Sequence, residues 1–595
     1  MYLNFDEYKE KVKSCFIGKT VGGTLGMKFE GDCNINEVTY YDPVPDTMLP
    51  NDDLDLQVVN LETILRTGLP VCRYHIGEIW KHHIADSAPD EYGVAISNHA
   101  LKINAPLSGI YRNKFYAGMG GAIRSELWAC LAPANPYLAA MLAREDACTD
   151  HTEDGVYAEM FLAAVESAAF VESDLKKLIN IGLEFIPEGN RLRNAFDDIL
   201  IWWEELGDIK KVREKILEKY IVDNWTDVTI NLSFIFLSLI SCEGSFDKAI
   251  CTAVSLGYDA DCTGATVGSV FGIMNSNLID KKWTEPIGNK LVLSPCIINM
   301  HEAGTIDDFC DKIISLAVDI QKYYKTDIEF ENVNAEKINL AKPWLKNPDF
   351  VFNWENGAKE SLVCLNPVMV TVCYPDFVAL EPNKPTEYKL KITNITDSDI
   401  VINAEMNVPD NWTVELSHNS FAIASGETLL VPFRITAQNV KRRTLLNILT
   451  VKLSVNGLKF DVEAGIPLTA PWTVTNLDDG TERICETNNI YFPVPKGSYK
   501  YTTKIKSPST RKVRISAGGT SKFKLIINGE EIFSGDASFY VPTFHRDESW
   551  TYANLNVGEN EIEVIFDNDL DGEFFFGFST VYSCAIWLDS IERYL

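Results

Sequence analysis

The spacing of apolar residues divides the chain into a first part with helical periodicity and a second part with strand periodicity. In the first part, apolar residues recur every three or four positions, as in segments 157–173 and 194–220. This spacing places apolar side chains along one side of an α-helix. The pattern therefore predicts that residues 1–345 form an all-α domain, a bundle of helices.

A different pattern begins after residues 342–357, where short runs alternate apolar and polar residues between turns. Alternation at every second position is typical of strands that bury one face. The dipeptide Asn456-Gly457 lies between two such runs and favours the tight turn of a β-hairpin. Several short strands within about 100 residues predict an immunoglobulin-like β-sandwich over residues 365–470.

A second break lies at residues 471–489, and alternating runs resume after it. Two of these runs, LIINGEEIFSG (525–535) and LNVGENEIEV (555–564), resemble motifs of the galactose-binding-like jelly rolls attached to many glycoside hydrolases. The preceding sandwich likewise resembles the small immunoglobulin-like modules of such enzymes. These resemblances imply a jelly-roll β domain over residues 488–595. The alternative is that both β domains cover an interface between copies of the chain in a homo-oligomer.

Charge and composition narrow the classes of partner. The formal net charge of −30 argues against nucleic acid and against anionic membranes, because both require a basic face. No window reaches the roughly 18 uninterrupted apolar residues of a transmembrane helix, and the N-terminus lacks a secretion signal pattern. The 14 cysteines show no CxxC pair, which suits a reducing compartment. We therefore expect a cytoplasmic protein that binds neither nucleic acid nor membrane.

Two groups of aspartates are the first candidates for chemistry. Asn51 can cap a helix that begins at Asp52, which places Asp52 and Asp53 in its first turn. Such acids often do no more than stabilise the helix dipole. Adjacent carboxylates in a first turn point about 100° apart, so they can also serve two neighbouring cations.

Asp259 and Asp261 form the second group, ahead of a run of small residues typical of a buried helix. Residues two apart on a regular helix lie on nearly opposite faces, so these carboxylates converge only if GYDAD is an irregular lead-in turn. Burying both requires counter-charge, yet no lysine or arginine occurs between Lys248 and Lys281. The four aspartates are hard oxygen donors, which predicts Mg²⁺, Mn²⁺ or Ca²⁺.

Three segments in chain order carry a family resemblance: GGTLGMKFE (22–30), NDDLD (51–55) and GYDADCTGA (257–265). They resemble the motifs G-D-x-L-G-x-P-x-E, T-D-D-T and G-x-D-T-D-T-x-A-A of the ADP-ribosylglycohydrolase family. The resemblance spans most of the first part of the chain. It implies an all-α fold with a centre of two divalent cations, usually magnesium or manganese.

The matching positions imply roles for particular residues. The resemblance makes Asp52, Asp53, Asp259 and Asp261 metal ligands, and it places Glu30 near the bond that is cleaved. At two further positions of the metal set this chain differs from the family. Asn51 and Cys262 stand where the family motifs have threonines that bind the metal. An amide oxygen remains a suitable ligand, whereas a thiol is a poor one for Mg²⁺. Either one cation is held weakly or Thr263 contributes instead. Gly23 stands where the first motif has its aspartate.

Two intervening segments resemble a longer-chain branch of the same family. They are GMGGAIRSELWACLAPANP (118–136) and DHTEDGVYAEM (150–160). In that branch the matching regions line the substrate pocket, which implies a substrate-binding set of Gly118, Gly120, Arg124, His151, Gly155 and Tyr157. A structural salt bridge of Arg124 and a hydrogen-bonded core histidine at position 151 are the alternatives.

Two cations held by shared carboxylates can bind vicinal sugar hydroxyls or activate a water molecule. We expect Glu30 to act as the catalytic acid or base, with Asp55 as a second candidate. The acidic chain, the diverged motifs and the β modules favour a metal-dependent hydrolase of a glycosidic bond in a small saccharide or glycoside. The alternatives are an ADP-ribosyl hydrolase, acting on protein or small molecules, and a non-catalytic scaffold that binds a sugar or nucleotide.

Overall fold

A computed structural model describes residues 1–300, 304–331, 355–440, 443–488, 491–536, 549–581 and 592–594. The contacts within the chain divide it into two compact units. The first unit contains Met1–His83 together with the described residues 116–331 and 355–356. The second contains Ile84–Phe115 and the described residues from 357 onward. The predicted boundary at residue 345 lies outside the described residues.

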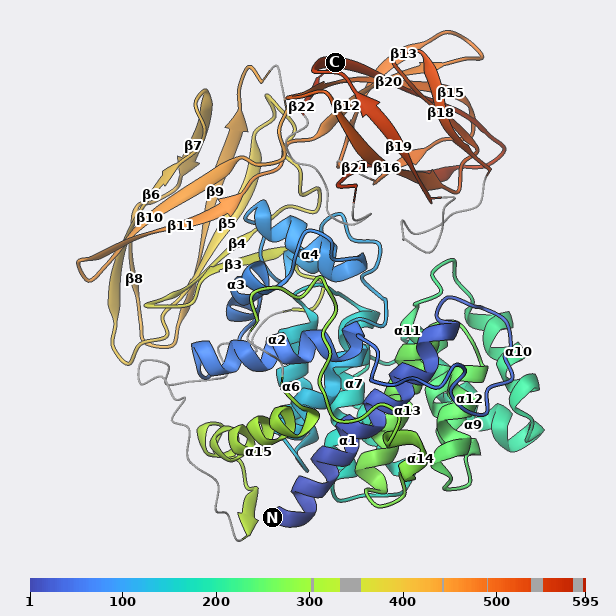
Figure 1. Cartoon of the computed structure of the whole chain (residues 1–595). Coiled ribbons are helices and arrows are strands. Elements are labelled where there is room, and N and C mark those ends of the chain that lie inside the picture. The colour runs from blue at the N-terminus through green and yellow to red at the C-terminus, as the bar shows by residue number, and fades with distance from the viewer. Residues whose placement is uncertain are drawn as a thin grey trace. The chain divides into compact units, whose positions relative to one another are not determined.

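The first unit is helical, as the periodicity predicts (Figure 1). Its helices commonly begin at a side chain that accepts hydrogen bonds from the first turn, for example Asn4 before α1 and Asp227 before α11. A short parallel pair of strands, β1 (Tyr2–Asn4) and β2 (Glu329–Glu331), joins the two ends of this unit. The helices are α1 (Phe5–Gly26), α2 (Asp52–Thr67), α3 (Arg73–His83), α5 (Ser125–Leu131), α6 (Pro136–Ala147), α7 (Asp154–Ala169), α8 (Leu175–Leu183), α9 (Arg191–Leu206), α10 (Ile209–Tyr220), α11 (Val228–Ser241), α12 (Phe246–Ser255), α13 (Ala260–Met274), α14 (Lys281–Thr284) and α15 (Ile306–Tyr323).

Helices α1 and α13 pack against each other through glycines spaced four residues apart on each helix. A Cβ added to Gly22 would lie 1.9 Å from the carbonyl oxygen of Gly264, and one added to Gly268 would lie 2.1 Å from that of Gly18. Backbones can approach this closely only where neither residue has a side chain. The run of small residues after Asp261 is therefore explained by contact with α1, which buries the start of α13.

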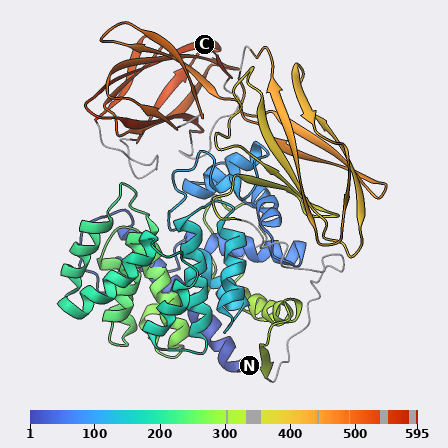
Figure 2. The ribbon, with the colours of Figure 1, turned by 180° about the vertical axis from the view of Figure 1, so that it is seen from behind.

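The second unit contains two β-sandwiches with separate cores, drawn in yellow to orange and in orange to red in Figure 2. In the first sandwich a five-stranded sheet, β3-β4-β5-β9-β7, faces a four-stranded sheet, β11-β10-β6-β8. The expected hairpin at Asn456-Gly457 is confirmed, because Val455 pairs with Leu458 and both turn residues have positive φ. The strands are β3 (Glu360–Cys364), β4 (Met369–Cys373), β5 (Thr386–Thr393), β6 (Ile400–Asn407), β7 (Trp412–Leu416), β8 (Ser420–Ile423), β9 (Thr428–Ala437), β10 (Ile448–Val455) and β11 (Leu458–Gly465).

The second sandwich packs the sheet β13-β12-β15-β20-β17-β18, to which β22 is added beside β15, against the sheet β14-β21-β16-β19. Its core is rich in aromatic residues, among them Trp472, Phe492 and Phe574. The strands are β12 (Ala470–Asn476), β13 (Glu482–Thr487), β14 (Tyr491–Val494), β15 (Gly497–Ser507), β16 (Arg511–Gly519), β17 (Phe523–Ile527), β18 (Glu530–Gly535), β19 (Trp550–Leu555), β20 (Gly558–Asn568), β21 (Gly572–Ser579) and β22 (Glu592–Tyr594).

Residues 84–115, which contain helix α4 (Asp90–Ala100), pack with the first sandwich. Leu101 and Leu107 enter the core of that sandwich, and Asn104 donates a hydrogen bond to the backbone carbonyl of Leu362. This stretch lies within the predicted helical domain in sequence but joins the β unit in space. The fold class, a helical domain followed by β domains, is confirmed. None of the helices in the described part of the chain is long and apolar enough to cross a bilayer.

Candidate metal centre

The first turns of α2 and α13 meet, and Asn51 joins them. Asn51 caps α2, where its side-chain oxygen accepts a hydrogen bond of 2.7 Å from the backbone N–H of Asp53. Its amide nitrogen donates across to Asp261 Oδ2, at 3.2 Å. One side chain therefore fixes the start of α2 against the start of α13, although the two segments are some 200 residues apart in sequence.

The approach to α13 is an irregular turn, as the spacing of its aspartates requires. Gly257 and Tyr258 both have positive φ, 76° and 67°, and helix α13 begins only after Asp259. A Cβ on Gly257 would lie 2.3 Å from the carbonyl oxygen of Asn34, so glycine is needed here for space as well as for conformation. The backbone N–H of Asp259 donates to the side-chain oxygen of Asn231 in α11, which anchors the turn.

Asp53, Asp261 and Cys262 bring their ligand atoms within 4.8 Å of one another. Their side chains are buried, with Asp53 only 2% exposed. Among the described residues, neither carboxylate oxygen of Asp53 has a hydrogen-bond partner, and Oδ1 of Asp261 has none either. Buried carboxylate oxygens are normally hydrogen-bonded or coordinated. This cluster of unsatisfied oxygens fits a divalent cation.

The electrostatics of the aspartates lead to the same conclusion. Burial raises the pKa of Asp53 well above its ordinary value, because the positive charge of Lys19 is outweighed by desolvation and by neighbouring acids. Burial likewise raises the pKa of Asp52 to about 6, and the negative charge of Asp261 adds to the effect. Lys19 donates to Glu126 at 2.8 Å, so its charge is already paired. Among the described residues, Lys19 does not offset the charge of these acids, which favours a bound cation.

The first motif contributes to the same place. A Cβ on Gly23 would lie 3.0 Å from the amide nitrogen of Asn51 and 3.5 Å from Asp53 Oδ2, so Gly23 borders the cluster. Thr263, the alternative ligand, is fully buried and its hydroxyl donates to the carbonyl oxygen of Ala260. That hydroxyl is therefore engaged with its own helix.

The two candidate catalytic acids have different surroundings. Glu30 directly follows the single turn Met27–Phe29 and is half-buried. It is near enough to Asp259 to contribute to the raised pKa of that residue, which desolvation and Asp261 chiefly cause. Asp55 is fully buried, and its two oxygens accept hydrogen bonds of 3.2 and 3.1 Å from the backbone N–H of Ser294. Of the two, Glu30 is the carboxylate with solvent access.

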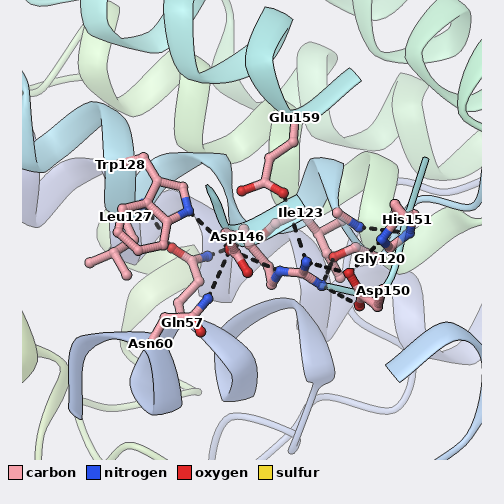
Figure 3. A network of polar contacts seen from close by, with 12 residues as sticks. Gln57, Asn60, Gly120, Ile123, Leu127, Trp128, Asp146, Asp150, His151 and Glu159 are labelled. Atoms are coloured by element: carbon pink, nitrogen blue, oxygen red, sulfur yellow. Dashed lines mark hydrogen bonds and ion pairs between the residues drawn. The ribbon is translucent and has the colours of Figure 1, made fainter. Parts of the chain in front are cut away.

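Arg124 belongs to a fully buried polar network, shown in Figure 3. Its guanidinium donates to Asp146 at 3.0 Å and to both oxygens of Asp150 at 2.8 and 2.9 Å. It also donates to the carbonyl oxygen of Gly120 at 2.7 Å and lies 3.8 Å from Glu159. These contacts occupy the guanidinium and tie together the segments that precede α5 and α7.

The other residues of the predicted substrate set surround this network. His151 Nε2 accepts the backbone N–H of Gly121, and its Nδ1 contacts Asp150 at 2.7 Å. A Cβ on Gly155 would lie 2.3 Å from the carbonyl oxygen of Tyr116. Gly118 forms a β-bridge with Asp227, and Tyr157 is half-buried on α7. The structure thus connects Gly120, His151 and Gly155 to the network of Arg124 and Asp150.

Sequence reasoning missed the buried pair Lys19–Glu126. Gln57 and Ser269 also donate to Glu126, each at 2.9 Å, so the pair connects α1, α2, α5 and α13. The position of Lys19 between Gly18 and Gly22 could have indicated this pair. A lysine buried within a helix contact needs an acidic partner.

Comparisons with known proteins identify the family of the helical part of the chain. The family model for ADP-ribosylglycohydrolase matches residues 5–320. A solved ADP-ribosylglycohydrolase-related protein complex is 18% identical, with 53% of this chain and 99% of that chain covered, at a TM-score of 0.39. An α-L-rhamnosidase from Streptomyces avermitilis, complexed with L-rhamnose, is 11% identical over 36% of this chain and 23% of its own, at a TM-score of 0.13. A search of curated proteins finds no match. Because the family model matches more than half of the residues, the chain belongs to the ADP-ribosylglycohydrolase family.

Proposed function

We propose that the helical unit hydrolyses a glycosidic bond in a small saccharide or glycoside, with the aspartate cluster as its metal centre. Membership of the family supports hydrolysis of a glycosidic type of bond. The observation that carries the proposal is Asp53, whose buried carboxylate has both oxygens unsatisfied among the described residues. An acid of this kind is stable in a folded protein when a cation or a proton neutralises it.

The proposed ligands are Asp52, Asp53, Asp259 and Asp261, with Asn51 holding the two helix starts together. Divalent cations at such a centre supply fixed positive charge that orients sugar hydroxyls and stabilises a departing oxygen. Magnesium is the cation that the family resemblance implies, and the oxygen ligands suit it.

Glu30 is the residue that we propose to move the proton. Its carboxyl is half-buried, near Asp259, and remains accessible to a substrate or to water. Asp55 is less suited, because the backbone N–H of Ser294 already donates to both of its oxygens. A proton held by Glu30 can pass to the leaving oxygen, after which the carboxylate can accept one from water.

The choice of a neutral sugar over ADP-ribose is supported by charge. A pyrophosphate group needs positive partners. The net charge of the chain is −30, and the two buried cations named above, Lys19 and Arg124, are both paired with carboxylates. ADP-ribosyl hydrolysis remains the second candidate, because family membership favours it.

The experiment compares turnover of ADP-ribosyl-arginine, ADP-ribosyl-serine and a panel of aryl glycosides, with Mg²⁺ or with a chelator. We expect release from a glycoside that is lost with chelator and in Asp261→Asn, and retained in Asp197→Asn, an exposed acid on α9. Chelator-sensitive release of ADP-ribose alone would establish the second candidate. Thermal stabilisation by a sugar without turnover would instead identify a binding scaffold.

A further inference from the structure

The sulfur of Cys262 lies beside the buried carboxylates of Asp53 and Asp261. The thiols of Cys148 and Cys242 each contact a backbone carbonyl oxygen of their own helix, at 3.6 and 3.1 Å, which is an ordinary setting for a structural cysteine. Cys262 is adjacent to Asp261, yet its sulfur and that carboxylate converge with Asp53 within 4.8 Å. It is 7% exposed, in the first turn of α13.

The spacing of these three atoms suits one cation. A tetrahedral cation with bonds of about 2.0–2.3 Å holds its ligands about 3.5 Å apart. Ligand atoms that lie within 4.8 Å of one another reach this arrangement by small side-chain rotations. Asp261 Oδ2 accepts a hydrogen bond from Asn51, whereas its Oδ1 has no hydrogen-bond partner among the described residues.

The chemistry of the set differs from that of a site built from oxygen alone. Mg²⁺ and Ca²⁺ bind oxygen ligands and discriminate against sulfur. Zn²⁺ and Co²⁺ accept a thiolate together with carboxylates, and the thiol releases its proton to solvent on binding. A thiol beside two buried carboxylates therefore makes the two expected cation positions unequal.

We propose that Cys262 is a sulfur ligand of the centre, and that the position it shares with Asp53 and Asp261 selects Zn²⁺ or Co²⁺ over Mg²⁺. This inference rests on the proposed function only in that both use the same centre. The remaining carboxylates of the centre, among them that of Asp52, offer oxygen alone and keep a preference for Mg²⁺. The centre is then one in which two different cations are bound side by side.

The test is cobalt titration of the full chain after chelator treatment, followed by near-ultraviolet and visible absorption. We expect a sulfur-to-cobalt charge-transfer band that disappears in Cys262→Ser and Cys262→Thr and persists in Cys251→Ser, a half-buried cysteine on α12. Competition by equilibrium dialysis should show the affinity for Zn²⁺ falling roughly 10- to 100-fold in Cys262→Ser, while the affinity for Mg²⁺ is unchanged or improved. Unfolding of each variant in chelator controls for damage to the fold.

The outcomes separate this inference from the proposed function. Cobalt could bind without a charge-transfer band and with equal affinity in the wild type and in Cys262→Ser. This result would overturn the sulfur ligand and leave the hydrolase proposal intact. Failure of every tested cation to bind would overturn both. A sulfur–cobalt band in a protein that hydrolyses none of the substrates would support the ligand and refute the activity.

Discussion

Replacing Gly26 by alanine tests whether the packing of α1 on α13 sets the geometry of the metal centre. Gly26 has φ −77° and ψ −29°, a helical conformation in which alanine is favoured over glycine by roughly 0.5–1 kcal/mol. However, an added Cβ would lie 2.3 Å from both the carbonyl oxygen of Ala260 and the Cα of Asp261. A normal contact is about 3.5 Å, so the start of α13 must move by about 1 Å.

The higher helix propensity of alanine and the steric clash of its Cβ have opposite effects on stability, and the clash is the larger of the two. Overpacking a core by one methyl group typically costs 1–3 kcal/mol, so we expect Gly26→Ala to destabilise the protein by about 1–2 kcal/mol. A displacement of 1 Å at a catalytic group can lower turnover about 100-fold. Urea unfolding in chelator measures the first effect, and cation titration with turnover measures the second. Glu10→Ala, on the exposed side of α1, is the control. A Gly26→Ala protein as stable as the wild type, with unchanged cation affinity, would refute the reasoning.

Three further changes probe the buried charges. Asp53→Asn should stabilise the chelator-treated protein by about 1–3 kcal/mol, because it removes a buried carboxylate whose oxygens have no partner among the described residues. It should also abolish the rise in Tm that cations produce. A Tm that still responds to cations would contradict the assignment of Asp53 as a ligand. Burial raises the pKa of Asp55 to about 7, so the folded protein binds this proton more tightly than the unfolded chain does. Stability of the chelator-treated protein should therefore fall by up to about 4 kcal/mol between pH 4 and pH 7, and Asp55→Asn should flatten that part of a pH series of unfolding curves; an unchanged slope excludes Asp55. Arg124→Ala should lower the free energy of unfolding by about 3–5 kcal/mol, because it leaves Asp146 and Asp150 buried without their cation. Circular dichroism during urea unfolding measures this loss. A loss below about 1 kcal/mol would show that the network is dispensable for stability.

The features that local sequence determines were predicted, and those that depend on distant partners were not. Three predicted features are properties of short segments, and the structure contains all three: the helices, the cap at Asn51 and the irregular turn before α13. The packing of residues 84–115 with a β-sandwich depends on contacts with residues more than 200 positions away. The Lys19–Glu126 pair spans 107 positions, and nothing near either residue names its partner.

The proposed metal centre would reconcile two requirements that conflict in an apolar core. The glycines of α1 and α13 hold the end of α1 against the start of α13, where Asp53 and Asp261 are buried away from water. The same burial raises the pKa values of these carboxyls and leaves their negative charge costly. Lys19 is the nearby cation on α1, but its charge is paired with Glu126. Because this packing leaves the carboxylates with more negative charge than Lys19 offsets, we expect cation binding to stabilise the first turns of α2 and α13.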